Sequence, residues 1–227
     1  MNALLELPVA RLRRTPRAWL PVALWSLLAV GAATMLRHAR IPSNASEALQ
    51  SPFGTFALPL LSYAVVGATL GGEGLSRSTR SLVAFGATPF RAAFGSIAVA
   101  MVVAATLSSI VGVLVAVLGH GDGDPPLLRD AVATAWVAFL GGAAYGAAFA
   151  FGASFGKRGG GRAAILALDW VLGSGNETAA LVTPRAHLRS LLGGDAVASL
   201  SGHASALCLL LLAAAFAWLA ALRARRV

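Results

Sequence analysis

Charged residues are scarce in this sequence. Only 12% of its 227 residues are Asp, Glu, Lys or Arg, against roughly 25% in soluble domains. Four histidines and a single cysteine are scattered along the chain, without the paired spacing of a metal site. Cys208 has no partner for an intrachain disulfide, and we expect it to pack as a small apolar side chain. This composition argues against a soluble domain, and it predicts no metal site.

Long apolar runs are what the sequence has instead. Five uncharged blocks hold 19 to 30 residues each: Ala18–Leu36, Ala48–Gly72, Ala92–Gly121, Ala131–Gly156 and Ala196–Leu222. About 20 apolar residues in a helix cross the hydrocarbon core of a bilayer, so each block is long enough to span it. The sequence therefore predicts an all-α, polytopic membrane protein, with residues 1–227 forming a single transmembrane domain.

The distribution of basic residues predicts a sixth span over 163–175, although this run is short. With it, the N-terminus, the 73–91 loop, the 157–162 loop and the C-terminus share one side of the membrane. That side then holds two of the nine acids, Glu6 and Glu73, and thirteen of the eighteen basic residues: Arg11, Arg13, Arg14, Arg17, Arg77, Arg80, Arg91, Lys157, Arg158, Arg162, Arg223, Arg225 and Arg226. Because cytoplasmic loops collect Lys and Arg, we expect both termini in the cytoplasm. The predicted spans are about 18–36, 53–72, 91–118, 131–156, 163–175 and 204–222.

Three segments outside the spans have the composition of short helices. Residues 3–16 mix leucines with arginines and predict an interfacial helix at the membrane surface. Residues 73–90 predict a short amphipathic element whose helix covers 78–85, with Gly86 at its end and Pro89 starting the next span. Leu82, Val83 and Phe85 would lie on its apolar side, with Arg77 and Arg80 available to solvent. Residues 176–194 are only half apolar and predict a re-entrant or interfacial helical segment on the outer face.

Asp169 is the one carboxylate inside a predicted span. Intramembrane acids are functional candidates, but Asp169 lies only some seven residues into a short span. It could line a pathway or hold helices together, and the sequence favours neither role.

The stretch FGASFGKRGGGR, from Phe151 to Arg162, resembles two catalytic motifs and satisfies neither. Its G-x-S-x-G spacing places Ser154 at the cytoplasmic end of a span, whereas the four histidines fall at or beyond the outer face. A phosphate-binding loop needs a glycine where Phe151 stands and Ser or Thr where Arg158 stands. We therefore interpret the stretch as a basic turn, and expect neither hydrolysis nor ATP binding by this chain. The preference of cytoplasmic loops for Lys and Arg also explains the net charge of +9, so we do not expect the chain to bind nucleic acid.

The arrangement as a whole resembles the permease subunits of type-2 ABC transporters. Members of that family commonly carry a Glu after the second span, then a Gly-Thr pair, apolar residues and a Pro before the third span. Here Glu73, Ser78–Thr79, Leu82–Val83 and Pro89 take those places, with Ser replacing the glycine. The segment TPRAHLRSLLGG also resembles the Pro-containing segment that precedes the last span in that family.

The resemblance implies a fold with a cytoplasmic coupling helix between the second and third spans, which docks on a separate ATP-binding subunit. The coupling residues would be Glu73, Arg77, Thr79, Arg80, Leu82, Phe85, Pro89 and Arg91. ATP and Mg²⁺ would be held by that partner, so the chain itself would not be an enzyme. A second permease copy or a related permease would complete an exporter in a bacterial inner membrane.

Two other functions fit the same sequence. The stretch SLVAFGATPFRAAFG also resembles a cytoplasmic segment of the permeases of lipoprotein-release and cell-division complexes, which have four spans and a large outer domain. The chain could also be a non-transporting scaffold or assembly subunit of a larger membrane complex.

Overall fold

The computed structural model describes residues 3–38, 45–121, 123–156, 159–175 and 178–226. Every regular element in these ranges is helical, which confirms the predicted all-α class. Five helical segments are long and apolar enough to cross a membrane: Trp19–His38, Ala45–Thr69, Pro89–Gly119, Leu127–Ala153 and Gly202–Arg223. They correspond to the five long apolar blocks, so the chain is a multi-pass membrane protein.

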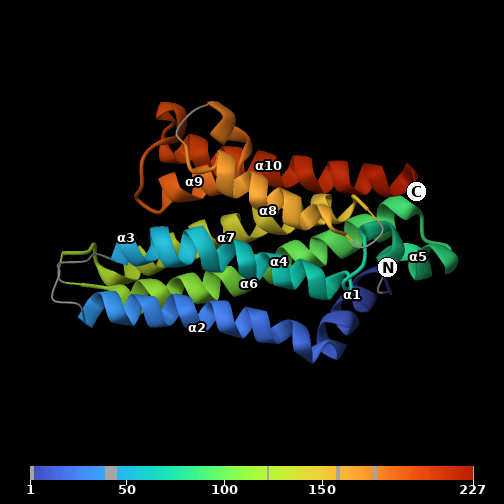
Figure 1. Cartoon of the computed structure of the whole chain (residues 1–227), viewed down its shortest axis with the longest axis horizontal. Helices are drawn as coiled ribbons and strands as arrows, with labels where there is room; N and C mark the ends of the chain where they lie inside the picture. The colour runs from blue at the N-terminus through green and yellow to red at the C-terminus, as the bar shows by residue number, and fades with distance from the viewer. Residues whose placement is uncertain (1–2, 39–44, 122, 157–158, 176–177, 227) are drawn as a thin grey trace.

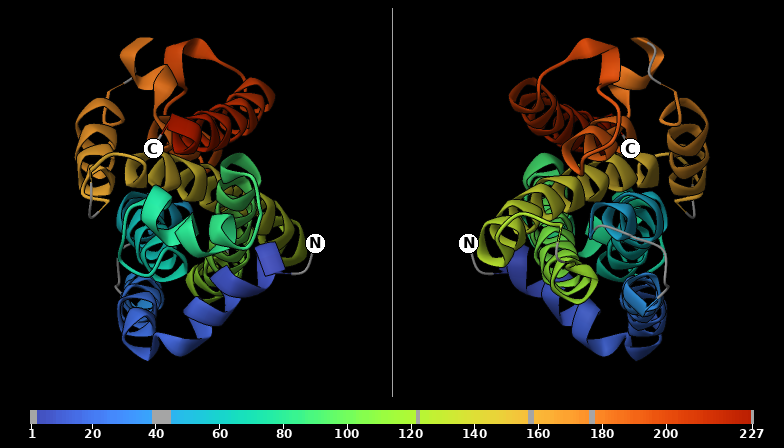
Figure 2. Two further views of the ribbon diagram at one scale, coloured as in Figure 1. Left: turned by 90° about the vertical axis from the view of Figure 1, so that its right-hand side faces the viewer. Right: turned by 90° about the vertical axis from the view of Figure 1, so that its left-hand side faces the viewer.

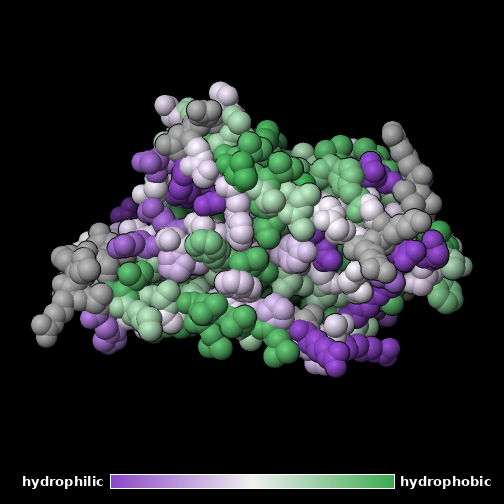
Figure 3. Space-filling model, in the orientation of Figure 1, coloured by the Kyte–Doolittle hydropathy of each residue, from purple (hydrophilic) through white to green (hydrophobic). Residues whose placement is uncertain are grey.

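The long helices run along one direction and form an elongated bundle (Figure 1). They are α2 (Pro16–His38), α6 (Pro89–Gly119), α7 (Leu127–Ala153) and α10 (Gly202–Arg223), together with α4 (Leu58–Thr69), which is the last part of the long segment Ala45–Thr69. Seen from the ends, α4, α6 and α7 lie in the middle, with α2 on one side and α10 on the other (Figure 2). Hydrophobic residues form a band across the middle of the face in Figure 3, with hydrophilic residues towards its two ends.

Small residues let the central helices approach closely. A Cβ added at Gly142 of α7 would lie 2.7 Å from the backbone oxygen of Ala104 in α6, and one at Gly146 would lie 3.0 Å from the Cα of Met101. Without Cβ atoms at these positions, the two backbones can touch, as they do at small-residue interfaces in lipid. Tyr145 and Phe149 of α7 fill the adjacent core and are fully buried.

The second long segment changes helical pitch along its length. It starts as α3 (Ala45–Ala48), widens into the π-helix η1 (Leu49–Ala57) and continues as α4. Pro52 lies inside η1, where its missing N–H removes a ladder hydrogen bond. One carbonyl of this wide turn, that of Thr55, accepts a 3.2 Å hydrogen bond from the Trp170 indole.

A shorter helix, α8 (Gly161–Leu172), carries the chain from the end of α7 back along the bundle (Figure 1). Its 12 residues are about 18 Å long, less than the roughly 30 Å hydrocarbon core. The one-turn η2 (Thr178–Val182), α9 (Pro184–Leu191) and the single turn η3 (Val197–Ser199) then lead into α10. Compared with the span predicted at 163–175, the helix α8 starts two residues earlier and ends three residues earlier.

The N-terminal segment folds as α1 (Ala3–Arg14), the place where the sequence predicts an interfacial helix over 3–16. It lies at an angle to the long helices and against α6 and α4 (Figure 2). The indole of Trp19 donates a 3.2 Å hydrogen bond to the carbonyl of Leu12 and thereby fixes the turn into α2. Arg13 and Arg14 are exposed on α1.

Candidate functional site

The predicted coupling segment contains α5 (Leu75–Ala84), a helix of 10 residues between α4 and α6. One side of α5 packs on the bundle, where Leu75, Ser78, Thr79 and Leu82 are buried. The sequence predicts the helix over 78–85, so the observed helix starts three residues earlier. In Figure 1, α5 lies at the same end of the bundle as the start of α1 and the end of α10.

Glycine turns fix both ends of α5. Gly71 and Gly72 have φ of +68° and +74°, a conformation that glycine adopts without steric cost. At the other end, Gly86 has φ of +90°; its N–H donates to the carbonyl of Val83, and the N–H of Ala87 donates to that of Leu82. This pair of hydrogen bonds is a Schellman cap, which ends a helix in a defined direction.

Helix α6 then starts where the sequence places the start of the third span. The Thr88 side chain accepts a 3.4 Å hydrogen bond from the N–H of Arg91, and Pro89 is the first residue of the helix. A proline is pre-organised for that position and has no N–H to leave unpaired. The helix α5 is thus attached to α4 and α6 by two short, defined turns.

The outward side of α5 carries two cations and a large aromatic residue. Arg77 and Arg80 are exposed, and their guanidinium groups make no hydrogen bond or ion pair with another residue in the described part of the chain. Phe85 follows the last helical residue and is 91% exposed. The sequence groups Phe85 with Leu82 and Val83 on the apolar side of the helix, but of these three residues only Leu82 is buried. Phe85 is the C-cap residue, where the backbone leaves the helical conformation, so its side chain does not continue the buried face of the helix.

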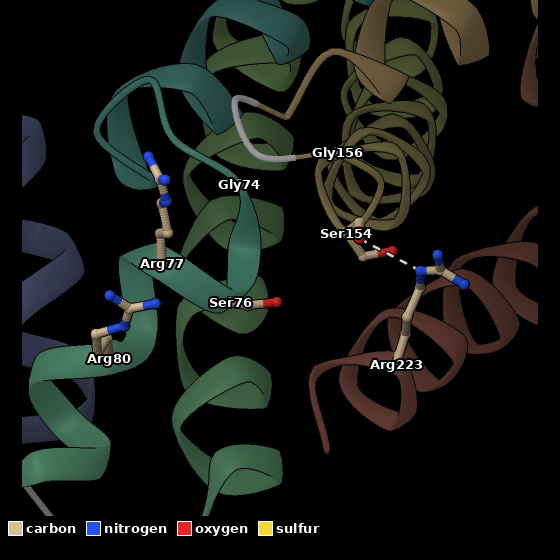
Figure 4. Close-up of a pocket in the computed structure, with 7 residues that line it drawn as sticks. All are labelled: Gly74, Ser76, Arg77, Arg80, Ser154, Gly156 and Arg223. Atoms are coloured by element: carbon tan, nitrogen blue, oxygen red, sulfur yellow. Dashed lines mark hydrogen bonds between the residues drawn. The ribbon is translucent and has the colours of Figure 1, made fainter. Parts of the chain in front are cut away.

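A cavity of about 350 Å³ lies beside α5, between it, the end of α7 and the end of α10 (Figure 4). Its lining residues come from these elements and the turn after α7: Gly74, Ser76, Arg77, Arg80, Ser154, Gly156 and Arg223. Arg223 donates a 3.3 Å hydrogen bond to the carbonyl of Ser154 and lies 4.1 Å from the ring centre of Phe155. The lining thus contains three arginines and no acid.

The structure brings together some of the predicted coupling residues and separates others. Thr79 is buried, and its hydroxyl donates to the carbonyl of Leu75; it cannot contact a partner directly. Glu73 and Arg91 are exposed on either side of α5. Sequence reasoning missed Ser154 and Arg223 as neighbours of this helix, because nothing in the chain order indicates that the ends of α7 and α10 meet beside it.

Arg162 is one of the thirteen basic residues assigned to the cytoplasmic side, but its side chain is buried. It is 7% exposed, its Nε donates to the carbonyl of Gly159 at 3.2 Å, and its guanidinium lies 5.1 Å from the ring centre of Tyr63. A Cβ at Gly67 would come within 2.7 Å of its Nη1. Lys157 and Arg158 lie outside the described residues.

Asp169 is buried where α7, α8 and α9 meet. Its carboxylate accepts a 2.6 Å hydrogen bond from the Tyr145 hydroxyl and a 3.2 Å hydrogen bond from the N–H of Arg185. The Arg185 guanidinium donates to the carbonyl of Trp170 at 3.0 Å. Arg185, in the segment predicted at 176–194, thus ties α9 to α8 through two hydrogen bonds, one to the Asp169 carboxylate and one to the Trp170 carbonyl.

Within the described residues, no three His, Cys, Asp or Glu side chains group together in a way that could hold a metal ion. The Ser154 hydroxyl donates to the carbonyl of Phe151 at 2.7 Å. Comparisons of the chain with protein-family models, curated proteins and solved structures found no match, so a functional assignment has to come from the geometry.

Proposed function

We propose that this chain is the membrane-spanning permease subunit of an ABC transporter of the type-2 class, and that a separate ATP-hydrolysing subunit docks on α5. The observation that carries the proposal is the form of α5 itself. It is anchored by buried residues on one side and attached by two short turns to α4 and α6. On its outward side it presents Arg77, Arg80 and Phe85, which are exposed and make no hydrogen bond or ion pair through their side chains to any described residue. A helix held in this way can transmit a push to α4 and α6.

The proposed topology has six crossings with both termini in the cytoplasm. The start of α1 and the end of α10 lie at the same end of the bundle (Figure 1), which supports an even number of passages along it. Five long helices make an odd number, so we assign the sixth passage to α8 together with the segment up to α9. The exposed arginines of α1, α5 and the C-terminus then face the cytoplasm, as the positive-inside bias requires.

Energy would come from ATP and Mg²⁺ in the partner subunit, and the cargo would pass between two permease copies or this one and a related permease. The interior of one copy is filled by packed apolar side chains, which favours a pathway between copies. ATP binding would change the distance between two docked ATPase subunits. The α5 helices would transmit this movement to the membrane helices, which would rock between two states that differ in their contacts. The residues of the spans are mostly Ala, Leu, Val and Gly, which favours export of a hydrophobic or amphipathic cargo.

The proposal is tested by exchanging the charges on α5. We expect the chain, purified from its native membrane, to retain a subunit with a Walker A motif and to hydrolyse ATP. The double variant Arg77→Glu/Arg80→Glu should lose that subunit and the associated ATP hydrolysis. We expect acidic residues of the partner to face these arginines, and glutamates at both positions would repel them.

The matched control is Arg13→Glu/Arg14→Glu, which makes the same charge change on α1 at the same end of the bundle. This control should retain the ATPase. Equal loss from both double variants would contradict a specific role for α5. A native preparation without any ATP-hydrolysing subunit would favour the scaffold function instead.

A further inference from the structure

An apolar groove runs between α6 and α10 and starts near the basic end of the bundle. It has a volume of about 370 Å³ and is lined by Phe94, Ile97, Ala98, Met101, Val102, Ala214, Ala217 and Trp218. The residues of α6 recur at the three- and four-residue spacing of one helix face, and so do those of α10. Because three of the lining residues are alanines, the two helices leave a hollow between the larger side chains.

Aromatic rings and a cation close the groove at its basic end. Phe90 packs edge-on against Trp218, with ring centres 5.3 Å apart, and stacks on Phe94 at 6.0 Å. The guanidinium carbon of Arg225 lies 4.4 Å from the ring centre of Phe90. Arg91 is exposed one turn before Phe94 on the same face of α6. Both guanidinium groups are without an acidic partner in the part of the chain that the structure describes.

This order of groups along the groove matches the layers of a bilayer. Trp is enriched at headgroup level, which suits Trp218 at the basic end of the groove, and the apolar residues beyond it lie at the depth of acyl chains. Basic pockets between transmembrane helices bind anionic headgroups. We propose that the groove holds one acyl chain of an anionic phospholipid, whose phosphate is bound by Arg225 and Arg91.

Charge favours a lipid over a second copy of the chain as the occupant. A copy related by a twofold axis along the membrane normal would place its own Arg91 and Arg225 at the same depth. Two such pairs of cations would repel each other across a shared interface, whereas a phosphate neutralises them. The inference needs only that the chain spans a membrane, and it does not depend on an ATPase partner.

The headgroup part of the proposal is tested by lipid retention of the purified full-length protein, measured by native mass spectrometry. Phosphatidylglycerol should be retained in preference to phosphatidylcholine with the same acyl chains. Because one arginine near a membrane surface contributes about 1 kcal/mol of attraction, Arg225→Gln should lower this preference about fivefold. Arg13→Gln, at the same end but away from the groove, should leave it unchanged. An equal effect of both variants would overturn the proposal.

The acyl-chain part is tested by filling the groove. Ala214→Leu introduces a larger side chain into it and should reduce the retention of both lipids. Ala215→Leu makes the same change at the next residue, which is exposed and does not line the groove, and it should retain both. Equal retention in the two variants would overturn the proposal, as would a change in oligomeric state, rather than in lipid content, for Ala214→Leu alone.

Discussion

Asp169 and Tyr145 illustrate how single polar residues are accommodated inside this bundle. The carboxylate has two donors, a hydroxyl from α7 and a backbone N–H from α9. A buried acid costs free energy unless such partners are in place. The sequence leaves open whether Asp169 lines a pathway or holds helices together. This arrangement supports the second role, because the carboxylate oxygens accept hydrogen bonds from two other helices.

Removing the Tyr145 hydroxyl should destabilise the protein. Tyr145→Phe leaves the buried carboxylate with one donor, and we expect a loss of about 1–3 kcal/mol in the free energy of unfolding, measured as a lower melting temperature in detergent. Tyr63→Phe is the matched control, because the Tyr63 hydroxyl makes no hydrogen bond to another described residue. The structural role would be contradicted by equal melting temperatures of the two variants.

Phe85 should matter for partner binding and hardly at all for folding. Its side chain is 91% exposed, so Phe85→Ala removes almost no intramolecular packing. Exposed aromatic residues at the centre of an interface commonly contribute more than about 1 kcal/mol to binding. We therefore expect partner affinity to fall about fivefold or more, with an unchanged melting temperature. A lower melting temperature without a change in affinity would show that Phe85 packs against its own chain.

At the scale of helices, the bundle depends on small residues at the α6–α7 contact. Gly142→Ala would place a methyl group 2.7 Å from the backbone oxygen of Ala104, and backbone cannot move aside as a side chain can. We expect this variant to lower the melting temperature clearly. The matched control is Gly31→Ala in α2, where a Cβ meets nothing within 4 Å. The importance of this contact would be refuted if both variants melted alike.

The sequence predicts the long helices well and the short ones less well. Long apolar runs leave a chain in a membrane few alternatives to helix, so the five long segments follow from composition. The widened turn at Leu49–Ala57 and the burial of Arg162 could not be predicted, because both depend on contacts between distant segments. The guanidinium of Arg162 packs over the ring of Tyr63 in α4 and donates a hydrogen bond to the carbonyl of Gly159. The outward position of Phe85 depends on the direction of a single cap.

At the scale of the whole molecule, the central claim is that the end of the bundle carrying α5 faces the cytoplasm. The exposed arginines of α1, α5 and the C-terminus lie at this end, and the sequence predicts this grouping from charge alone. The structure adds that the ends of α7 and α10 meet beside α5, which charge counting could not predict. A partner that docks on α5 therefore also approaches Arg223.

Cysteine accessibility in intact cells tests this claim most directly. With the native Cys208 replaced by Ala, single cysteines are introduced at Ser81, exposed on α5, and at Ser199, exposed before α10. The account predicts that a membrane-impermeant maleimide labels Ser199→Cys in intact cells and labels Ser81→Cys only after the membrane is permeabilised. Labelling of Ser81→Cys in intact cells would contradict the proposed orientation and with it the docking of a cytoplasmic ATPase.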